Sequence, residues 1–374
     1  MRAPIAVMHL VDTLAVGGAE RMAVNLVNNL PRDRFTAHLC CTRHDGALTS
    51  LVDAHVERLT LDRVHRFDPS ALARLVAHIR KHDVRLLHAH SAAVFAAVLA
   101  AVVPPHPAVI WHDHHGQSLG SRTSWPYRLI ARRLSHVIAV NESLAHWARD
   151  TMGVPATRVS YIPNFVVPTS AMGTAVELPG RPDRRVACVA NLRPQKGHAT
   201  LIAAFARVVA VVPDARLLLM GAESDMGYAA ALRRAVDEAG ITNSVSWLGV
   251  RDDVAQLLQA CSVGVLSSHS EGLPLALLEY GAAGLASVAT HVGQCADVLD
   301  HGQAGVLVPP SEPLQLADAI IALLHDQPRR STLGEALRTR VANCYSASRA
   351  MASVGAIYDA VLESDSGGAR GYGE

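Results

Sequence analysis

The sequence is poor in aromatic residues, in long hydrophobic segments and in net charge. Phe, Trp and Tyr make up 4% of the 374 residues, and the formal net charge at pH 7 is +1. A balanced charge gives the chain no overall attraction to nucleic acid or to a membrane, so any basic surface must be local. The charge-free apolar run at residues 92–103 is well short of the ~20 residues that a membrane-spanning helix needs.

Cysteine pairs at metal-binding or redox spacing are also missing, because none of the six cysteines forms a Cys-x-x-Cys motif. Cys40, Cys188 and Cys261 lie in apolar segments, so we interpret them as buried thiols in a reducing compartment. The N-terminal segment is too soon interrupted to read as a signal peptide. We therefore expect a cytoplasmic protein that is at most attached to the inner face of the cytoplasmic membrane.

Apolar segments that are typical of strands alternate with helical segments along the chain, and half of all residues are hydrophobic. This alternation predicts an α/β fold with parallel sheets and helices on both faces. The length suits two domains. We place their boundary at residues 163–182, which are rich in Pro, Gly, Ser and Thr. The expected parts are domains 1–165 and 183–345, a last helix 346–363 and a disordered tail 364–374.

The most informative segment follows the predicted strand 263–266. It places Glu271 in a polar loop, Pro274 at the start of a helix and Glu279 inside that helix. The free N–H groups and the dipole of a helix start attract anions. Two carboxylates can accept hydrogen bonds from sugar hydroxyl groups. On spacing alone, two solvated glutamates are the simpler interpretation.

Two further loops follow predicted strands. Gly17 and Gly18 come after strand 5–10, where paired glycines let the backbone approach a ligand closely, although a plain tight turn explains them equally well. Arg193 and Lys196 come after strand 185–190 and precede a helix. Two cations in such a place can hold a diphosphate through charge-assisted hydrogen bonds.

Three histidines and an aspartate follow the predicted strand at residues 108–111, in the order His112, Asp113, His114, His115. Neighbouring residues of an extended chain point to alternate faces, so we favour solvent-exposed loop histidines over a metal site.

The next segment, up to Asn141, contains no acidic residue. It contains Arg122, Arg128, Arg132 and Arg133, which are interleaved with apolar residues. Such a helix can lie on an anionic membrane surface, or it can be an ordinary surface helix with a buried apolar face. The sequence leaves these two interpretations open.

The segment Ser268-x-x-Glu271-Gly272-Leu273-Pro274 with Glu279 resembles the Glu-x7-Glu signature of retaining GT-B glycosyltransferases of family 4, also called glycosyl transferases group 1. Gly17-Gly18 and Arg193-x-x-Lys196-Gly197 match the two earlier motifs of that family in the same order. Phe165 departs from the family, which usually has Gly after the residue matching Asn164. The resemblance implies two Rossmann-like, doubly wound domains facing a cleft, with the last helix crossing back to the first domain.

The resemblance also implies a reaction, namely transfer of a sugar from a UDP- or GDP-linked donor to a hydroxyl group with retention. The acceptor would be a glycan or a lipid-linked glycan. The implied donor-binding residues are Gly17, Gly18, Arg193, Lys196, Gly221, Val250, Glu271, Gly272, Leu273, Pro274 and Glu279. Of these, Glu279 would hold the ribose, and Glu271 with the N–H groups of Gly272 and Leu273 would hold the sugar.

The implied catalytic residues are Glu271, His114, Arg193 and Lys196. The basic pair would stabilise the departing diphosphate, and His114 would lie near the reacting sugar, with His112 and His115 as register alternatives. There is no Asp-x-Asp triplet, so we expect catalysis without a metal or a cofactor. Two alternatives remain, a GT-B sugar-nucleotide epimerase and a non-catalytic nucleotide-sugar-binding protein.

Overall fold

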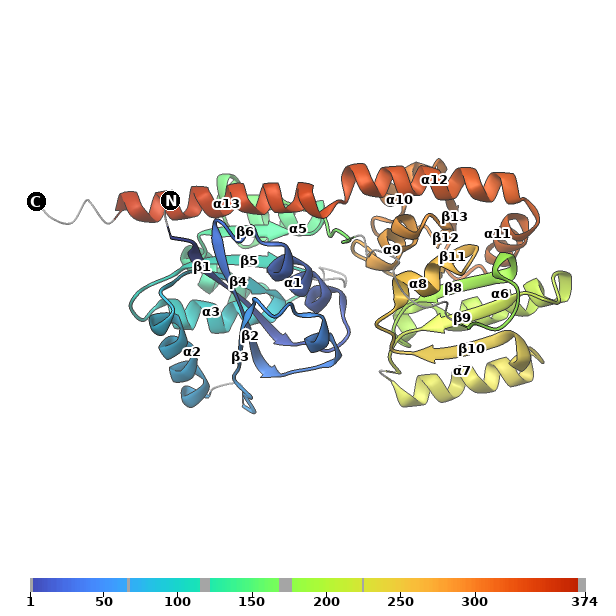
Figure 1. The fold of residues 1–374 in the computed structure, drawn as a ribbon, viewed down its shortest axis with the longest axis horizontal. Coiled ribbons are helices and arrows are strands. Elements are labelled where there is room, and N and C mark those ends of the chain that lie inside the picture. The colour runs from blue at the N-terminus through green and yellow to red at the C-terminus, as the bar shows by residue number, and fades with distance from the viewer. Residues whose placement is uncertain (1–2, 66–67, 115–121, 168–176, 224, 369–374) are drawn as a thin grey trace, which may run out of the picture. The chain divides into compact units, whose positions relative to one another are not determined.

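The computed structural model describes residues 3–65, 68–114, 122–167, 177–223 and 225–368. The chain forms two compact units. Unit 1 comprises Met1–Asn164 and Ala347–Glu374, and unit 2 comprises Phe165–Ser346. Each unit is an α/β layer structure with its own hydrophobic core (Figure 1).

Unit 1 contains a seven-stranded sheet in the order β3-β2-β1-β4-β5-β6-β7, and every strand pair is parallel. The strands are β1 Ile5–Thr13, β2 Phe35–His44, β3 Glu57–Thr60, β4 Val84–His90, β5 Ala108–Asp113, β6 His136–Ala139 and β7 Val159–Tyr161. The helices are α1 Gly18–Asn29, α2 Pro69–Lys81, α3 Val94–Ala101, α4 Trp125–Ile130, α5 Glu142–His146 and α13 Ala347–Gly368. Asn141 caps α5 by accepting from the Leu144 N–H at 2.8 Å.

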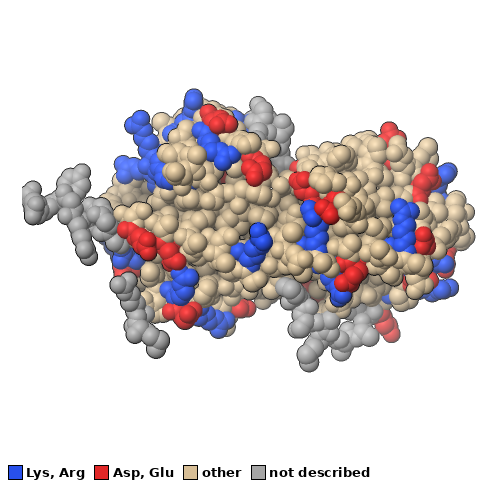
Figure 2. Space-filling model, turned by 90° about the horizontal axis from the view of Figure 1, so that it is seen from above, with Lys and Arg blue, Asp and Glu red and all other residues tan. Residues whose placement is uncertain are grey.

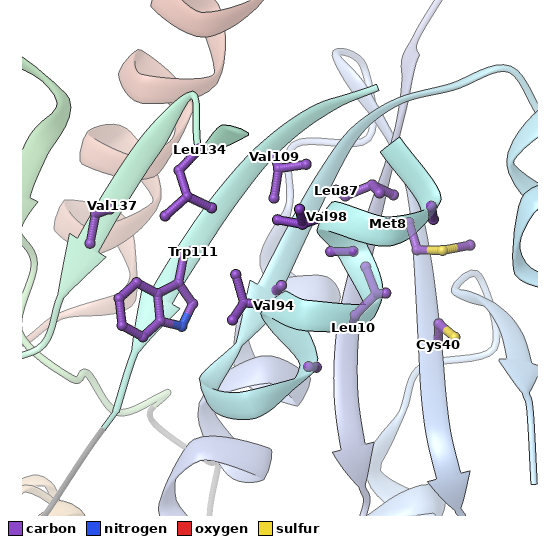
Figure 3. Close-up of a cluster of buried hydrophobic side chains, with 14 of the residues drawn as sticks. Met8, Leu10, Cys40, Leu87, Val94, Val98, Val109, Trp111, Leu134 and Val137 are labelled. Carbon is purple, nitrogen blue, oxygen red and sulfur yellow. The ribbon is translucent and has the colours of Figure 1, made fainter. Parts of the chain in front are cut away.

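The core of unit 1 lies between the sheet and its helices (Figure 3). Val94 and Val98 of α3 pack against apolar side chains of β4 and β5, including Leu87 and Val109. Trp111 is fully buried beside them. Runs of apolar residues in the strands are what a parallel sheet covered on both faces requires.

Unit 2 contains a six-stranded parallel sheet in the order β10-β9-β8-β11-β12-β13. The strands are β8 Arg185–Val189, β9 Arg216–Met220, β10 Val245–Gly249, β11 Val263–Leu266, β12 Ala286–Thr290 and β13 Val306–Val308. The helices are α6 His198–Val211, α7 Met226–Glu238, α8 Val254–Gln259, α9 Leu275–Ala283, α10 Cys295–Val298, α11 Pro313–His325 and α12 Gln327–Cys344.

Tyr280 fixes α9 to the centre of the unit 2 sheet. Its buried hydroxyl accepts from the Val189 N–H at 2.8 Å and donates to the Val265 carbonyl at 3.0 Å, so it links α9 to β8 and β11. Gly264 leaves room for the ring, because a Cβ there would lie 2.5 Å from it. The helix that carries Glu279 is therefore held in one register.

The last helix, α13, belongs to unit 1, as the resemblance implied. The Tyr358 hydroxyl contacts His88 Nδ1 at 2.6 Å and His9 Nε2 at 3.1 Å, and Arg34 donates to Asp359 at 2.7 Å. The helix continues to Gly368, whereas the sequence placed its end at residue 363. No helix among the described residues combines the length and the hydrophobicity needed to cross a bilayer.

Candidate functional site

Two loops carry most of the predicted donor residues of unit 2, and they leave neighbouring strands. One loop runs from the end of β8 to the start of α6, and the other runs from the end of β11 to the start of α9. The strand order reverses between β8 and β11. In open α/β sheets, ligands bind outside the carboxyl ends of the strands at such a switch point.

Lys196 and Glu271 form an ion pair between these loops. The Lys196 ammonium lies 2.6 Å from Glu271 Oε1, and the Ser268 hydroxyl donates to the same oxygen at 2.5 Å. The side chain of Glu271 is 7% exposed and that of Lys196 is 26% exposed. The carboxylate is therefore held in place, whereas the lysine side chain is partly open to solvent.

Backbone contacts hold the two loops together. The His269 N–H donates to the Gln195 carbonyl at 2.8 Å, and the Gln195 amide donates to the Ser270 carbonyl at 2.9 Å. Gly197 turns the chain into α6 with a φ of 66°, and a Cβ there would lie 2.0 Å from the Ser267 carbonyl oxygen. Only glycine fits this turn without moving the loop.

Arg193 stands apart from the ion pair. It is exposed, and within the part of the chain that the structure describes its guanidinium has no hydrogen-bond or ion-pair partner. Gly272, Leu273 and Pro274 lead from Glu271 into α9, with Pro274 at the cap position rather than in the first turn. The structure thus brings Lys196 together with Glu271 and leaves the Arg193 side chain in solvent.

Three other predicted donor residues of unit 2 lie on separate elements. Gly221 follows β9 with a φ of 155°, and a Cβ there would lie 2.1 Å from the Ala190 carbonyl oxygen, so it allows two strand ends to approach each other. Val250 follows β10 and is 47% exposed. Glu279 is half-buried on α9.

The glycine pair of unit 1 occupies the corresponding position in its own sheet. The strand order reverses between β1 and β4, and Gly17 and Gly18 lie where the chain passes from β1 into α1. A Cβ at Gly17 would lie 2.2 Å from Glu20 Oε2, because the Glu20 side chain folds back over the helix start. Gly18 is exposed.

A chain of five histidines runs beneath the same edge of the unit 1 sheet. His90 contacts His9 at 3.0 Å and His114 at 3.0 Å, and His88 contacts His112 at 3.1 Å, all between ring nitrogens. His112 and His114 lie two residues apart on one face, with ring centroids 4.1 Å apart. The interpretation of this segment as solvent-exposed loop histidines is therefore wrong for His112 and His114. His115 lies outside the described residues.

All five imidazoles are neutral at pH 7. Burial lowers the pKa of His9 and of His114 to about 3. Burial, reinforced by neighbouring histidines, holds the pKa values of His88, His90 and His112 well below 6.5. His114 Nδ1 is buried and has no partner within the described part of the chain. Sequence reasoning missed His9, His88 and His90, although the repeated His-x-His spacing in β4 and after β5 was a usable signal.

The structure contradicts the prediction that Arg122 faces a membrane. Its side chain is 6% exposed, and its guanidinium lies 2.6 Å from the Asp113 carboxylate. It also stacks over the rings of Tyr127 and Trp147, at 4.3 and 4.2 Å from their centroids. A cation that is enclosed by aromatic rings and a carboxylate cannot contact a lipid surface.

The other three arginines of that segment remain at the surface. Arg128 lies on α4, and Arg132 and Arg133 lie in the 3-10 turn that follows it; all three are exposed. Trp125 and Leu129 on the same helix are 64% and 70% exposed. In the view of Figure 2, most of the surface carries no charge, and basic and acidic side chains are intermixed on both units.

Two family models match the chain. The model described as Glycosyltransferase Family 4 matches residues 16–170, and the model described as Glycosyl transferases group 1 matches residues 183–326. Together the matched ranges contain Gly17, Gly18 and His114 in unit 1, and Arg193, Lys196, Glu271 and Glu279 in unit 2.

Relatives with curated names include an exopolysaccharide phosphotransferase of Streptomyces coelicolor, with 30% identity over 72% of this chain and 28% of the relative. The N-acetyl-alpha-D-glucosaminyl L-malate synthase of Bacillus anthracis is 32% identical over 48% of this chain and 46% of the relative. The phosphatidyl-myo-inositol mannosyltransferase of Mycolicibacterium smegmatis is 29% identical over 71% of this chain and 69% of the relative. The match thus spans less than half the length of the first two relatives.

Solved structures share the fold. Anabaena HepE in complex with UDP and glucose matches with a TM-score of 0.79 and 21% identity, over 95% of this chain and 100% of that one. WaaG, described as a glycosyltransferase involved in lipopolysaccharide biosynthesis, matches with a TM-score of 0.69 and 14% identity, over 92% of this chain and 98% of that one. Two Rossmann-like units and a last helix that belongs to the first unit confirm the predicted GT-B class.

Proposed function

We propose a function that follows from the family, because the chain belongs to the family 4 (group 1) glycosyltransferases. In this proposal, it transfers a sugar from a nucleotide-diphosphate donor to a hydroxyl group of an acceptor, with retention of anomeric configuration. One observation carries the proposal: the Lys196–Glu271 pair lies at the switch point of unit 2, with the Lys196 side chain partly open to solvent. This arrangement suits a ligand that brings both a diphosphate and sugar hydroxyl groups.

Binding of the donor would redistribute the contacts of this pair. The diphosphate would attract the Lys196 ammonium and the exposed Arg193 guanidinium, since both are strong donors to phosphate oxygens. Glu271 would then accept hydrogen bonds from sugar hydroxyl groups, and the N–H groups of Gly272 and Leu273 would donate to sugar oxygens. Glu279 would hold the ribose. In this proposal, Gly221, Val250 and Pro274 line the remainder of the donor site.

The chemical step would break the bond between the anomeric carbon and the diphosphate oxygen and form a bond from that carbon to the acceptor oxygen on the same face. The proton of the acceptor hydroxyl would pass to the departing diphosphate oxygen. Lys196 and Arg193 would stabilise the negative charge that develops on the diphosphate, which is usually the largest contribution to catalysis. We propose that Gly17, Gly18 and His114 contribute from unit 1. Because the imidazole of His114 is neutral, it can act there as a hydrogen-bonding group without adding charge.

The donor and acceptor classes follow from the family and the named relatives. We propose a UDP- or GDP-linked sugar and a glycan or lipid-linked acceptor, in keeping with the bound UDP of HepE and the lipid named for the Mycolicibacterium relative.

A lipid-linked acceptor would be consistent with peripheral membrane contact through Arg128, Arg132 and Arg133, with Arg122 now excluded. Sedimentation with vesicles containing anionic lipid tests this contact. We expect the double variant Arg128→Ala/Arg132→Ala to bind less than Arg234→Ala/Arg329→Ala, which removes the same charge from exposed positions of unit 2.

Product analysis tests the reaction itself. The purified protein is incubated with UDP- and GDP-sugars, with and without a hydroxyl acceptor, and NMR follows nucleotide release and the anomeric configuration of the product. Transfer with retention is expected, and Glu271→Gln should reduce it by at least about a hundredfold, whereas Glu238→Gln at an exposed position should not. An epimerised sugar nucleotide formed without acceptor would identify an epimerase, and nucleotide binding without turnover would identify a binding protein.

Metal dependence is tested in the same assay. We expect turnover to survive EDTA, because Lys196 and Arg193 can carry the charge of the diphosphate. Loss of turnover that Mg²⁺ or Mn²⁺ restores would refute this part of the proposal.

A further inference from the structure

A second histidine cluster lies in unit 1, away from the strand ends described above. It consists of His38 on β2, His78 near the end of α2 and His82, which caps that helix. His38 is near the amino end of its strand, and α2 ends immediately before β4 begins. The cluster therefore lies at the amino ends of the parallel strands, opposite to the edge where Gly17 and His114 lie.

The three imidazoles are close enough to share one ion. One ring nitrogen from each lies within 4.8 Å of the other two, and His38 Nδ1 is 3.2 Å from His78 Nε2. Two nitrogens that coordinate one tetrahedral Zn²⁺ at about 2.0–2.1 Å are about 3.3 Å apart. The first two ligands are thus almost at coordinating separation, and the third needs only a small side-chain adjustment.

The local chemistry also favours a cation. His78 and His82 are four residues apart on one helical face. They stack with ring centroids 4.2 Å apart, and His82 Nε2 is buried without a partner in the described part of the chain. The carbonyl end of α2 adds partial negative charge.

A carboxylate stands beside the cluster. Glu57 on β3 lies opposite His38 in the β2–β3 ladder, so the two side chains leave the same face of the sheet. Its charge acts on both His38 and His78, in the direction that favours positive charge there, and Lys81 acts on His78 in the opposite direction. Three imidazoles and one carboxylate form a ligand set that Zn²⁺ commonly takes.

We propose that His38, His78 and His82 bind a transition-metal ion of the Zn²⁺ class, with Glu57 as the fourth ligand or as a hydrogen-bond acceptor for one of the rings. The five-histidine chain is a weaker candidate, because its ring nitrogens are largely occupied by contacts with one another and with Tyr358. In the smaller cluster, His78 and His82 are half-exposed, which gives a hydrated ion a way in.

The ion would act on stability rather than on turnover. It would link α2 to β2, two elements that are far apart in the sequence, at the sheet edge that in α/β proteins supports the fold rather than the ligand. This proposal does not rest on the proposed glycosyltransferase activity.

Metal titration of the full chain tests the proposal. The protein is purified without a histidine tag, stripped with a chelator, dialysed and titrated calorimetrically with Zn²⁺. Co²⁺ is then added to look for the visible absorption of a tetrahedral site. The variants are His82→Ala and Glu57→Gln, and the control is His146→Ala, which removes an exposed histidine from the same unit.

We expect one ion per chain, a higher melting temperature with Zn²⁺, and loss of both effects in His82→Ala. Even the loss of an outer-shell partner costs about 10–100-fold in affinity, so losing a ligand should weaken binding by at least about tenfold. Glu57→Gln keeps the histidines and should weaken binding less. Absence of Zn²⁺ binding, or binding that His82→Ala leaves as tight as His146→Ala does, would overturn the proposal.

Discussion

Replacing Arg122 with Met should strongly destabilise unit 1. The Arg122 guanidinium lies 2.6 Å from the Asp113 carboxylate, and their side chains are only 6% and 2% exposed. Burial alone lowers the pKa of Arg122, yet the neighbouring carboxylate outweighs this effect and raises it. The substitution removes the cation and leaves a buried carboxylate without its main counter-charge.

The size of the effect follows from these contacts. Removing one partner of a buried ion pair costs about 3–5 kcal/mol, because the remaining charge is uncompensated. The lost stacking on Tyr127 and Trp147 adds about 0.5–2 kcal/mol. A change of about 4 kcal/mol, at about 2 kcal/mol per molar urea, lowers the unfolding midpoint by about 2 M.

Urea unfolding followed by tryptophan fluorescence measures this change where it occurs. Three of the four tryptophans, Trp111, Trp125 and Trp147, lie in unit 1. The matched control is Arg58→Met, which breaks an exposed ion pair with Asp45 and should cost about 0–1 kcal/mol. If Arg122→Met lowers the midpoint no more than Arg58→Met does, the account of Arg122 as a buried structural cation is refuted.

Two further predictions use the same unfolding assay. Burial holds the folded-state pKa of His9 and of His114 at about 3, below the ordinary 6.5. Between these two pH values the unfolded chain therefore binds more protons than the folded chain. Unit 1 should then lose stability as the pH falls from about 6.5 towards 3. Between pH 7.5 and 5.5 each group should contribute about 1.4 kcal/mol, and an unchanged midpoint would contradict this. Gly197→Ala should destabilise unit 2 more than Gly240→Ala, as monitored by circular dichroism. Both positions have a positive φ, which costs an alanine about 1–2 kcal/mol. Only at Gly197 would the new Cβ meet backbone atoms, because a Cβ at Gly240 would have no heavy atom within 4 Å. Equal losses of stability in the two variants would show that the loop moves to accommodate the new Cβ.

Much of the fold could be predicted from local patterns. Short apolar segments such as residues 263–266 and 286–290 alternate with helices, and parallel sheets bury such strands on both faces. Within unit 2, the Glu271 and Lys196 loops meet because β8 and β11 are neighbours at the switch point. The pairing of β8 with β11 joins segments that are far apart in the sequence, and only the resemblance to the family predicted it.

Two features escaped prediction for identifiable reasons. Arg122 looked like a surface charge, because the aromatic side chains that enclose it come from three separate elements. His112 and His114 looked like loop residues, because their partners His88 and His90 lie on another strand. In each case burial is decided by packing between distant segments, which composition and periodicity do not report.

The central claim is that the switch point of unit 2 binds a nucleotide diphosphate. Calorimetric titration with UDP, GDP and ADP tests it most directly, on the wild type and on Lys196→Ala. The account predicts that one nucleotide binds and that the substitution weakens its affinity at least about tenfold, the loss of one charge-assisted contact. The result that would contradict it is either no binding of any of the three nucleotides or binding that Lys196→Ala leaves unchanged.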